Sequence, residues 1–275
     1  MGKKVDNRKG RWTNIVTMDF LHAIIFGIVE GITEFLPISS TGHLMLTAQV
    51  LGLGQTEFIK TFEIAIQLGA ILSVVVLYWR ALLVNMEIAK RVIAAFLPTA
   101  VLGLLFYKII KRYLLASTTV VLWSLLLGGI LLIIFEIIHR RKEERIHDLA
   151  SIPYPICVLI GLFQSISMIP GVSRAAATIV GGLLLGVNRK TIVEFSFLLA
   201  VPTMLAATCL DLYKNASSFS VEQTGFLAIG FAVSFVAALI GVKFLLGFIK
   251  SHTFIPFGIY RIGIVLLFWA FLLTR

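Results

Sequence analysis

The chain has 275 residues, of which 59% are hydrophobic and only 14% are charged. This composition lies far outside the soluble range and indicates an integral membrane protein. The formal net charge is +10, but the basic residues lie in short clusters between apolar runs. Anionic lipid headgroups and membrane topology account for such clusters. Composition therefore excludes a soluble globular fold, and we expect no nucleic-acid partner.

Apolar runs of about twenty residues recur along the chain, each long enough to cross a hydrocarbon core of roughly 30 Å. The run Thr119–Ile138 is apolar all round, whereas the strands of a membrane β-barrel alternate apolar and polar residues. Cys157 and Cys209 both lie in apolar segments, which argues against a disulfide framework or a zinc site. The predicted class is an all-α polytopic membrane protein with a basic N-terminal tail at residues 1–19.

After the tail comes an apolar run of only ten residues, Phe20–Val29, about 15 Å of helix and half a bilayer. Pro37 and Gly42 then interrupt any helix, and Leu44–Leu53 supplies a second half-length run. This pattern predicts a re-entrant helical hairpin over residues 20–53. Irregular backbone at membrane depth is tolerated only where it is buried in protein or lines a wet cavity.

The remaining chain predicts six full spans and a second hairpin, joined by a charged central loop. The spans are expected at 62–84, 88–110 and 118–138, and then at 191–213, 224–248 and 256–273, with the loop at 139–154 and the second hairpin at 155–187. Residues 20–138 and 155–275 thus repeat one order of elements. Three crossings per repeat invert the second copy, so the two hairpin tips are expected to meet near the midplane.

The first hairpin carries Glu30 and Glu34, whose i, i+4 spacing places both carboxylates on one helix face. Ionised carboxylates in hydrocarbon require a compensating charge. Arg174 of the second hairpin is one candidate and a divalent metal held by Glu30 and Glu34 is another, because Mg²⁺ commonly combines one or two carboxylates with substrate phosphate oxygens. A purely structural Glu–Arg clamp between the repeats stays open as an alternative.

Ser39, Ser40 and Thr41 stand where a loop enters the second half-helix. Hydroxyls and free backbone N–H groups at a helix start favour an anion, although one serine could simply cap the helix. His43 follows and is a candidate nucleophile toward phosphorus or a general acid. A lone histidine would usually be a packing residue, but these neighbours favour chemistry.

Arg174 follows Pro170-Gly-Val-Ser in the second hairpin. A planar guanidinium binds two phosphoryl oxygens at once and stays charged, so Arg174 is the predicted phosphate clamp. Ser173 and Gln164 are further phosphate-binding candidates. Thr178 is another, unless its hydroxyl bonds back to its own helix.

Two motifs, Glu30–His43 and Pro170–Arg174, resemble the signature motifs of the bacitracin-resistance type of undecaprenyl-pyrophosphate phosphatases. Further similar stretches are Lys60–Gly69, Glu194–Pro202, Asp211–Lys214 and Phe254–Arg261. The resemblance therefore covers nearly the whole chain after the tail. Where the family has Ser-Arg-Ser-Gly-Ala-Thr, this chain has Ala175 and Ala176, which removes one phosphate donor without affecting Arg174.

The resemblance implies hydrolysis of undecaprenyl pyrophosphate to undecaprenyl phosphate and phosphate, which recycles the carrier lipid for cell-wall synthesis and confers bacitracin resistance. It implies functional roles for Glu30, Glu34, Ser40, Thr41, His43, Ser173, Arg174 and Thr178. Together with the analysis of the residues, this gives a catalytic set of Glu30, Glu34, Ser40, His43 and Arg174, with Ser39, Thr41, Gln164, Ser173 and Thr178 binding phosphate. The nucleophile, which is His43, Ser40 or a water, stays open. The implied cofactor is Mg²⁺ or Ca²⁺.

The expected partners are the polyprenyl pyrophosphate lipid and the bilayer of the bacterial plasma (inner) membrane, and a homodimer stays open. The rival interpretation is a transporter or flippase of lipid phosphates that breaks no bond, because paired hairpins in inverted repeats are also a transporter architecture.

Overall fold

The computed structural model describes residues 3–5, 12–14, 18–54, 56–109, 117–139, 145–215 and 224–273. Two three-residue strands, β1 (Lys3–Val5) and β2 (Trp12–Asn14), pair antiparallel near the N-terminus, and the other described elements are helices. Six of these helices are long and apolar enough to cross a membrane. The prediction of a helical, multi-span membrane protein with six spans is therefore confirmed.

The six long helices are apolar over most of their surface. They are α3 (Glu57–Trp79, continued by the π-helical turn η1, Arg80–Val84), α4 (Met86–Ile109), α5 (Thr118–His139), α8 (Arg189–Asn215), α9 (Thr224–Phe248) and α10 (Ile255–Leu273). Large side chains such as Leu104, Leu131 and Leu267 are exposed on them. Continuous exposed apolar surface of this kind is suited to contact with lipid.

Four helices are too short to cross a bilayer. They are α1 (Phe20–Thr33), α2 (Ser40–Val50), α6 (Tyr154–Ser165) and α7 (Arg174–Leu184), with the 3₁₀ turns η3 (Leu149–Ser151) and η4 (Ile166–Met168) beside α6. Asp19 caps α1 by accepting the His22 backbone N–H at 2.9 Å, and this bond lowers the pKa of the Asp19 carboxyl. Ser39 and Ser173 cap α2 and α7 in the same way.

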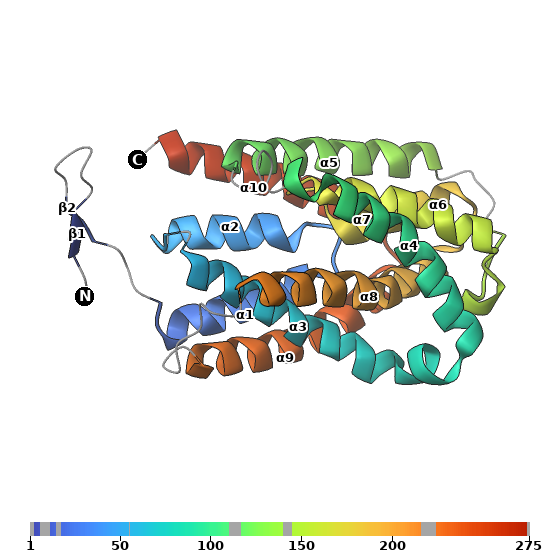
Figure 1. Cartoon of the computed structure of the whole chain (residues 1–275). Helices are drawn as coiled ribbons and strands as arrows, with labels where there is room; N and C mark the ends of the chain where they lie inside the picture. Colours follow the sequence, from blue (N-terminus) through green and yellow to red (C-terminus); the bar gives the residue numbers. More distant parts are fainter. Residues whose placement is uncertain are drawn as a thin grey trace.

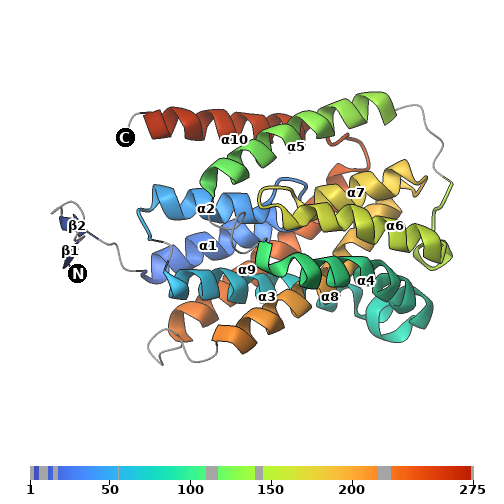
Figure 2. The ribbon, with the colours of Figure 1, turned by 45° about the horizontal axis from the view of Figure 1, so that its top comes forward.

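The helices pack in a pattern that is similar in the two halves of the chain. Helix α9 packs against α1 and α3, α4 packs against α6 and α8, and α5 lies beside α10 (Figures 1 and 2). Glycines allow several close approaches between the helices, two of which lie at corresponding places in the two halves. A Cβ at Gly27 would lie 2.8 Å from the Gly230 carbonyl oxygen, and one at Gly161 would collide with the carbonyl oxygen of Ala95. Only glycine lets these backbones touch.

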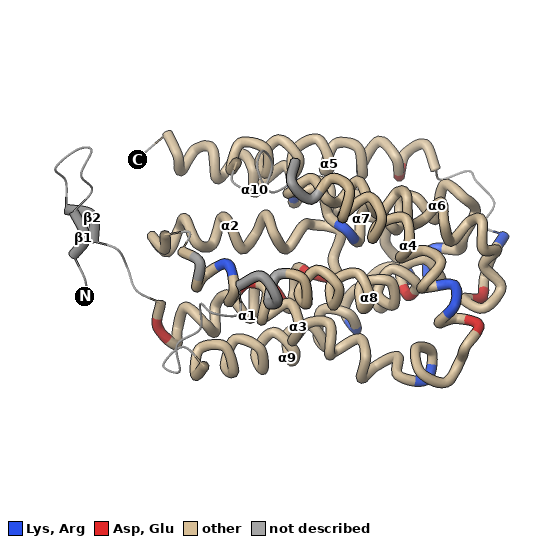
Figure 3. Tube along the Cα trace, viewed as in Figure 1, with Lys and Arg blue, Asp and Glu red and all other residues tan. Residues whose placement is uncertain are grey.

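Charged residues are sparse along the helices and gather mainly toward one end of the bundle, on the right of Figure 3. One ion pair connects α5, α8 and the start of α10. Arg189 of α8 donates to both carboxylate oxygens of Glu136 in α5, at 2.5 and 3.0 Å. Glu136 also accepts the backbone N–H of Phe254, just before α10, at 2.8 Å. The Glu136 carboxylate is thereby paired and hydrogen-bonded, as a fully buried charge requires.

The loop after α1 and the loop before α7 meet near the middle of the bundle. The pair α1–α2 approaches this region from one end and α6–α7 from the other (Figure 1). Their contact is direct, because the Ser173 hydroxyl donates to the carbonyl oxygen of Leu36 at 3.4 Å. The chemistry-bearing residues of both sequence motifs lie at this junction.

Candidate active site

A polar cavity of about 170 Å³ lies at the junction, large enough for several water molecules or a phosphate-sized anion. Six of the residues predicted from the sequence line it: Glu34, Ser39, Ser40, Thr41, Ser173 and Arg174. The wall therefore combines three hydroxyls and a carboxylate from the first motif with a hydroxyl and a guanidinium from the second.

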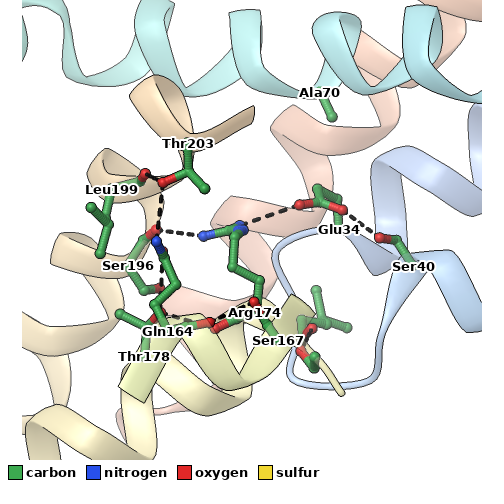
Figure 4. Close-up of polar contacts among 12 residues, drawn as sticks. Glu34, Ser40, Ala70, Gln164, Ser167, Arg174, Thr178, Ser196, Leu199 and Thr203 are labelled. Carbon is green, nitrogen blue, oxygen red and sulfur yellow. Dashed lines mark hydrogen bonds and ion pairs between the residues drawn. The ribbon is translucent and has the colours of Figure 1, made fainter. Parts of the chain in front are cut away.

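Arg174, the first residue of α7, reaches across the cavity between two other elements. Its Nη1 donates to the backbone carbonyl of Ser196 in α8 at 2.9 Å, and its Nη2 lies 3.3 Å from Glu34 Oε1 (Figure 4). Its Nε is buried and has no acceptor among the described residues. The guanidinium is thus held in place on one side and keeps an unused donor, which suits recognition of an anion.

Glu34 connects the two sequence motifs. One of its carboxylate oxygens faces Arg174, and the other accepts a hydrogen bond from the hydroxyl of Ser40 (Figure 4). A carboxylate that accepts a serine hydroxyl is placed to take the proton of that hydroxyl. Because Ser40 lines the cavity, its oxygen faces the space where an anion would lie.

Two helices begin at the cavity wall. Ser39 and Ser40 start α2, and Ser173 and Arg174 start α7. The first turn of a helix carries unpaired N–H groups and a partial positive charge. Ser39 adopts a left-handed conformation with φ of 71°, which a serine adopts only at a cost of order 1 kcal/mol or more. The helix start predicted at Ser39–Thr41 thus lies at the cavity wall, together with a second helix start, that of α7.

Glu30 lies one turn before Glu34 on α1, is fully buried and is not part of the cavity wall. Neither of its carboxylate oxygens has a hydrogen-bond partner among the described residues, and its charged neighbours are Glu34, Glu63 and Arg174. A buried carboxylate in this setting needs a proton or a cation. The orphaned oxygens, next to a second carboxylate, have the oxygen chemistry that a divalent cation prefers.

A complete metal-binding shell is not present among the described side chains, since no group of three or more His, Cys, Asp or Glu residues there has suitable geometry. Glu30 and Glu34 could supply two ligands. The remaining ligands would have to be substrate oxygens and water, as is usual for Mg²⁺. The residues present are therefore compatible with a metal that binds together with a phosphate-bearing substrate.

Gln164 and Thr178, both predicted to bind phosphate, lie in a buried network instead of the cavity wall. The Gln164 amide donates to Thr99 Oγ1 at 3.0 Å. It also donates at 3.1 Å to Oγ1 of Thr203, a residue labelled in Figure 4. Thr178 donates to the carbonyl of Arg174 in its own helix at 2.9 Å, the alternative already apparent from the sequence. The network connects α4, α6, α7 and α8, and through Thr178 it also binds the backbone carbonyl of Arg174.

His43 also lies outside the polar cavity, one turn further along α2. Its Nδ1 lies 2.7 Å from the carbonyl oxygen of Ser39, and its Nε2 lies 2.8 Å from the Tyr260 hydroxyl. A carbonyl can only accept, so Nδ1 carries the hydrogen. In the neutral ring, Nε2 then accepts from Tyr260. The lone pair that a nucleophile or base would use is therefore engaged by a residue of α10.

Sequence reasoning missed several residues of the site. Gln67, Ser167, Val172 and Met204 complete the cavity wall, and Tyr260 fixes His43. A further residue, Arg261, donates to the carbonyl of Gly171 at 2.9 Å, two residues before Ser173. Tyr260, Arg261 and Gln67 stand within stretches that resemble the phosphatase family, and Arg261 is also a lone arginine within an apolar span.

The fold and the cavity define a multi-span membrane protein with a buried site of carboxylate, hydroxyl and guanidinium groups. The chain belongs to the family of the bacitracin resistance protein BacA, whose sequence model matches residues 23–267. The membership expected from the two motifs is thus confirmed.

Relatives in other bacteria are similar over nearly their whole length. The chain is 55% identical to an undecaprenyl-diphosphatase of Aquifex aeolicus over 251 residues, which cover 91% of this chain and 98% of that relative. It is 53% identical to an undecaprenyl-diphosphatase of a Sulfurihydrogenibium species over 254 residues, 92% of this chain and 100% of the relative. A Campylobacter jejuni protein of the same name is 47% identical over 246 residues, 89% of this chain and 91% of the relative.

Proposed function

We propose that this protein hydrolyses undecaprenyl diphosphate to undecaprenyl phosphate and inorganic phosphate in the bacterial inner membrane. The reaction recycles the carrier lipid for cell-wall synthesis and confers bacitracin resistance. The observation that carries the proposal is the cavity between the two motifs, where Arg174 and two helix starts surround a hydroxyl that is hydrogen-bonded to a carboxylate. The undecaprenyl-diphosphatase relatives support the same assignment.

The proposed architecture is a pair of inverted repeats in which α1–α2 and α6–α7 are re-entrant hairpins. The packing supports it, since exchanging the halves maps the α1–α9 contact onto α6–α4 and the α3–α9 contact onto α8–α4. The close glycines agree, because Gly27 meets α9 at Gly230 and Gly161 meets α4 at Ala95. Polar, irregular loops at membrane depth would then face only protein and the cavity.

In the proposed binding mode the diphosphate head occupies the polar cavity. Arg174, which lines the cavity, contacts phosphoryl oxygens, while Ser39, Thr41 and Ser173 and the first N–H groups of α2 and α7 supply further hydrogen bonds. Arg174 also balances charge on the phosphoryl group as the bond breaks. Gln164 and Thr178 act indirectly, by holding the helices from which Arg174 and Ser173 project.

The geometry favours Ser40 over His43 as the group that attacks phosphorus. The Ser40 hydroxyl lines the cavity and donates to Glu34, whereas His43 lies outside it with Nε2 bound to Tyr260. In the proposed step, Ser40 Oγ bonds to the terminal phosphorus, the bond from that phosphorus to the bridging oxygen breaks, and Glu34 takes the serine proton. Undecaprenyl phosphate leaves, and water then hydrolyses the phosphoserine to release phosphate.

Mg²⁺ or Ca²⁺ is the proposed cofactor, held by Glu30 and Glu34 together with substrate oxygens. When bound, such an ion offsets negative charge on the diphosphate. The protein side of this proposal rests on the buried carboxylate of Glu30, which has no hydrogen-bond donor among the described residues.

The test is phosphate release from farnesyl diphosphate by purified protein in detergent with Mg²⁺. Ser40→Ala and Arg174→Gln should each lower kcat by about 10²-fold or more, and a chelator should abolish turnover. Matched controls are Ser151→Ala and Arg80→Gln, because both residues are exposed and neither lines the cavity, and both should retain wild-type rates.

The outcomes separate the alternatives. Normal turnover in Ser40→Ala alone would overturn the nucleophile assignment and leave the hydrolase intact. Normal turnover in all site variants would overturn the active site. If the wild-type protein releases no phosphate in detergent but moves a lipid phosphate across vesicle membranes, the transporter interpretation is correct, because detergent solution offers no membrane to cross.

A further inference from the structure

Gln67 stands in the wall of the polar cavity and takes no part in the step proposed for Ser40. It lies on α3, three residues before Ala70, which marks where α3 passes the site in Figure 4. Its side chain lines the cavity, and no hydrogen bond joins its amide to another of the described residues. A complete amide group, with its donors and its acceptor, is therefore available to whatever fills the cavity.

Most other polar groups of the wall are donors or are already engaged. Arg174 and the first N–H groups of α2 and α7 can only donate. The Glu34 carboxylate is committed to Arg174 and to the hydroxyl of Ser40, and the Ser173 hydroxyl donates to the carbonyl of Leu36. Such a wall suits phosphoryl oxygens, but it offers few acceptors to a water molecule.

The second proposed step, in which water hydrolyses the phosphoserine, needs such an acceptor. Glu34 takes the Ser40 proton in the first step, so its carboxyl group is neutral in the phosphoenzyme. It has to return that proton to Ser40 Oγ and is not a base for the incoming water. A water attacks phosphorus through a lone pair and points its hydrogens at acceptors. A group other than Glu34 therefore has to orient it.

Two wall residues that the first step leaves unused can accept a hydrogen bond. Ser167 donates its hydroxyl hydrogen to the carbonyl of Gln164 at 2.7 Å, so its oxygen can only accept from the cavity. Gln67 has an accepting carbonyl and a donating NH₂ group. Gln67 alone of the two can hold the water through its oxygen and a phosphoryl oxygen through its nitrogen. One side chain would thus fix the water relative to phosphorus.

The position of Gln67 in the fold also favours it over Thr41. In phosphoryl transfer the attacking and leaving oxygens lie roughly in line, on opposite sides of phosphorus. Thr41 lines the cavity too, but it directly follows Ser40 at the start of α2 and so stands next to the leaving oxygen. Gln67 comes from α3, a separate helix.

We propose that Gln67 positions the water that hydrolyses the phosphoserine. The inference rests on the proposed function, with Ser40 as the nucleophile. The water oxygen bonds to phosphorus, the bond from phosphorus to Ser40 Oγ breaks, and Glu34 returns its proton to that oxygen. Phosphate leaves with both hydrogens of the water and loses one of them to solvent. The Gln67 amide stays neutral throughout, because it orients the water and exchanges no proton with it.

The test follows the two steps separately in purified protein, with farnesyl diphosphate labelled in its terminal phosphate. Gln67→Met keeps the length of the side chain and removes both hydrogen-bonding groups. Gln49→Met is the matched control, because Gln49 does not line the cavity and its amide donates to Thr118. Acid quenching gives the amount of labelled phosphoserine, and the release of farnesyl phosphate and of phosphate gives the rates.

We expect Gln67→Met to slow phosphoserine hydrolysis about 10- to 100-fold, the loss that misplacing a reacting group causes. Labelled phosphoserine should accumulate, and farnesyl phosphate should appear in a burst before phosphate. The steady-state kcat should fall while kcat/KM stays at the wild-type value, because kcat/KM reports only the steps up to formation of the phosphoenzyme. An unchanged kcat/KM also shows that the variant is folded. Gln49→Met should behave as wild type.

Three results would overturn the inference. The first is an unchanged kcat in Gln67→Met. The second is a parallel fall of kcat and kcat/KM without phosphoserine, in Gln67→Met or, if that variant does not fold, in Gln67→Ala, because Gln67 would then act before the phosphoenzyme forms. The third is the absence of phosphoserine from every variant while the wild type releases phosphate. The hydrolase would survive all three, and it would fail only if the wild-type protein released no phosphate.

Discussion

Arg261 provides the sharpest test of how the second motif is held in place. This guanidinium on α10 is 1% exposed and donates to three backbone carbonyls, those of Ser124 at 3.0 Å, Leu125 at 3.2 Å and Gly171 at 2.9 Å. Gly171 has a φ of +90° and belongs to the loop that leads into Arg174. Arg261 therefore ties that loop to α5, and we predict that it positions Arg174.

The cost of Arg261→Met can be estimated from the three acceptors. Ser124 and Leu125 lie within α5, where the N–H groups four residues on also bond their carbonyls. The Gly171 carbonyl lies outside a helix, so it loses its donor. A hydrogen bond from a charged donor contributes about 1.5–3 kcal/mol. Removing a buried guanidinium also removes its desolvation penalty. The free energy of unfolding of the whole protein should therefore fall by less than the energy that holds the loop in place.

If the lost energy is what holds the loop in its catalytic position, kcat/KM should fall by about 10- to 150-fold, at 1.36 kcal/mol for each factor of ten. The thermal unfolding temperature, followed by tryptophan fluorescence in detergent, should fall by only a few degrees. Arg261→Lys keeps the positive charge, but a single ammonium group cannot reproduce the hydrogen bonds that the guanidinium makes to three carbonyls. It should therefore remain impaired.

A glycine pair gives an independent perturbation of the same contact. A Cβ at Gly128 would collide with Nη2 of Arg261 and lie 2.8 Å from its Cζ, whereas a Cβ at Gly263 would meet nothing within 4 Å. Both Gly→Ala changes raise helix propensity by about 1 kcal/mol. Gly128→Ala should therefore lower kcat/KM while Gly263→Ala does not. Equal activity in the two variants, or activity in Arg261→Met that falls only in step with unfolding, would refute the positioning role.

Two further predictions concern other buried contacts. Tyr260→Phe keeps the aromatic ring but leaves His43 Nε2 without its hydrogen-bond donor. The loss of about 1 kcal/mol should lower kcat for isopentenyl diphosphate roughly fivefold in steady-state assays. An unchanged kcat would show that the orientation of His43 is irrelevant to turnover. Glu136→Gln leaves Arg189 without its counter-charge and should destabilise the protein by about 3–5 kcal/mol in denaturant titration. Replacing Arg189 by Gln as well should recover part of that loss, and no recovery would argue against the ion pair.

Much of the fold and the central part of the site could be predicted from the sequence. Hydropathy alone marks the six spans, because each must be apolar over about twenty residues. The cavity residues Ser39, Ser40 and Ser173 could be found because helix starts carry local signals, a capping hydroxyl after a helix-breaking proline or glycine. Their proximity was predicted from the repeated order of elements, and the Ser173–Leu36 hydrogen bond shows that the two loops meet.

The residues that the sequence could not place depend on helix rotation. Tyr260 and Arg261 lie in a stretch that is apolar nearly all round, so periodicity does not reveal which face meets the site. Gln164 and Thr178 were expected at the cavity, because the sequence does not reveal how their helices are rotated. Their side chains instead point into a buried network with Thr99. A lone arginine within an apolar span is nevertheless a functional signal by itself.

The two proposed repeats differ in how they treat one pair of polar positions, and that difference indicates where the chemistry lies. Aligning Gly27 with Gly161 places Glu30 opposite Gln164, each three residues further on. Their contact residues Gly230 and Ala95 then align as well. Ser234 therefore corresponds to Thr99, each four residues after its contact residue. The second-repeat pair is hydrogen-bonded at 3.0 Å. Glu30 and Ser234 are fully buried, and their side-chain oxygens have no partner among the described residues.

Leaving buried polar groups unpaired costs about 1–3 kcal/mol each, and more for a charged group. A chain under selection for stability alone could replace Glu30 with the glutamine that its own second repeat already uses. The carboxylate in place of an amide therefore supports the proposal that Glu30 is satisfied by a proton or a metal ion. The second repeat then serves as the scaffold that holds Arg174, and the first repeat carries the groups that need substrate, proton or metal to be satisfied.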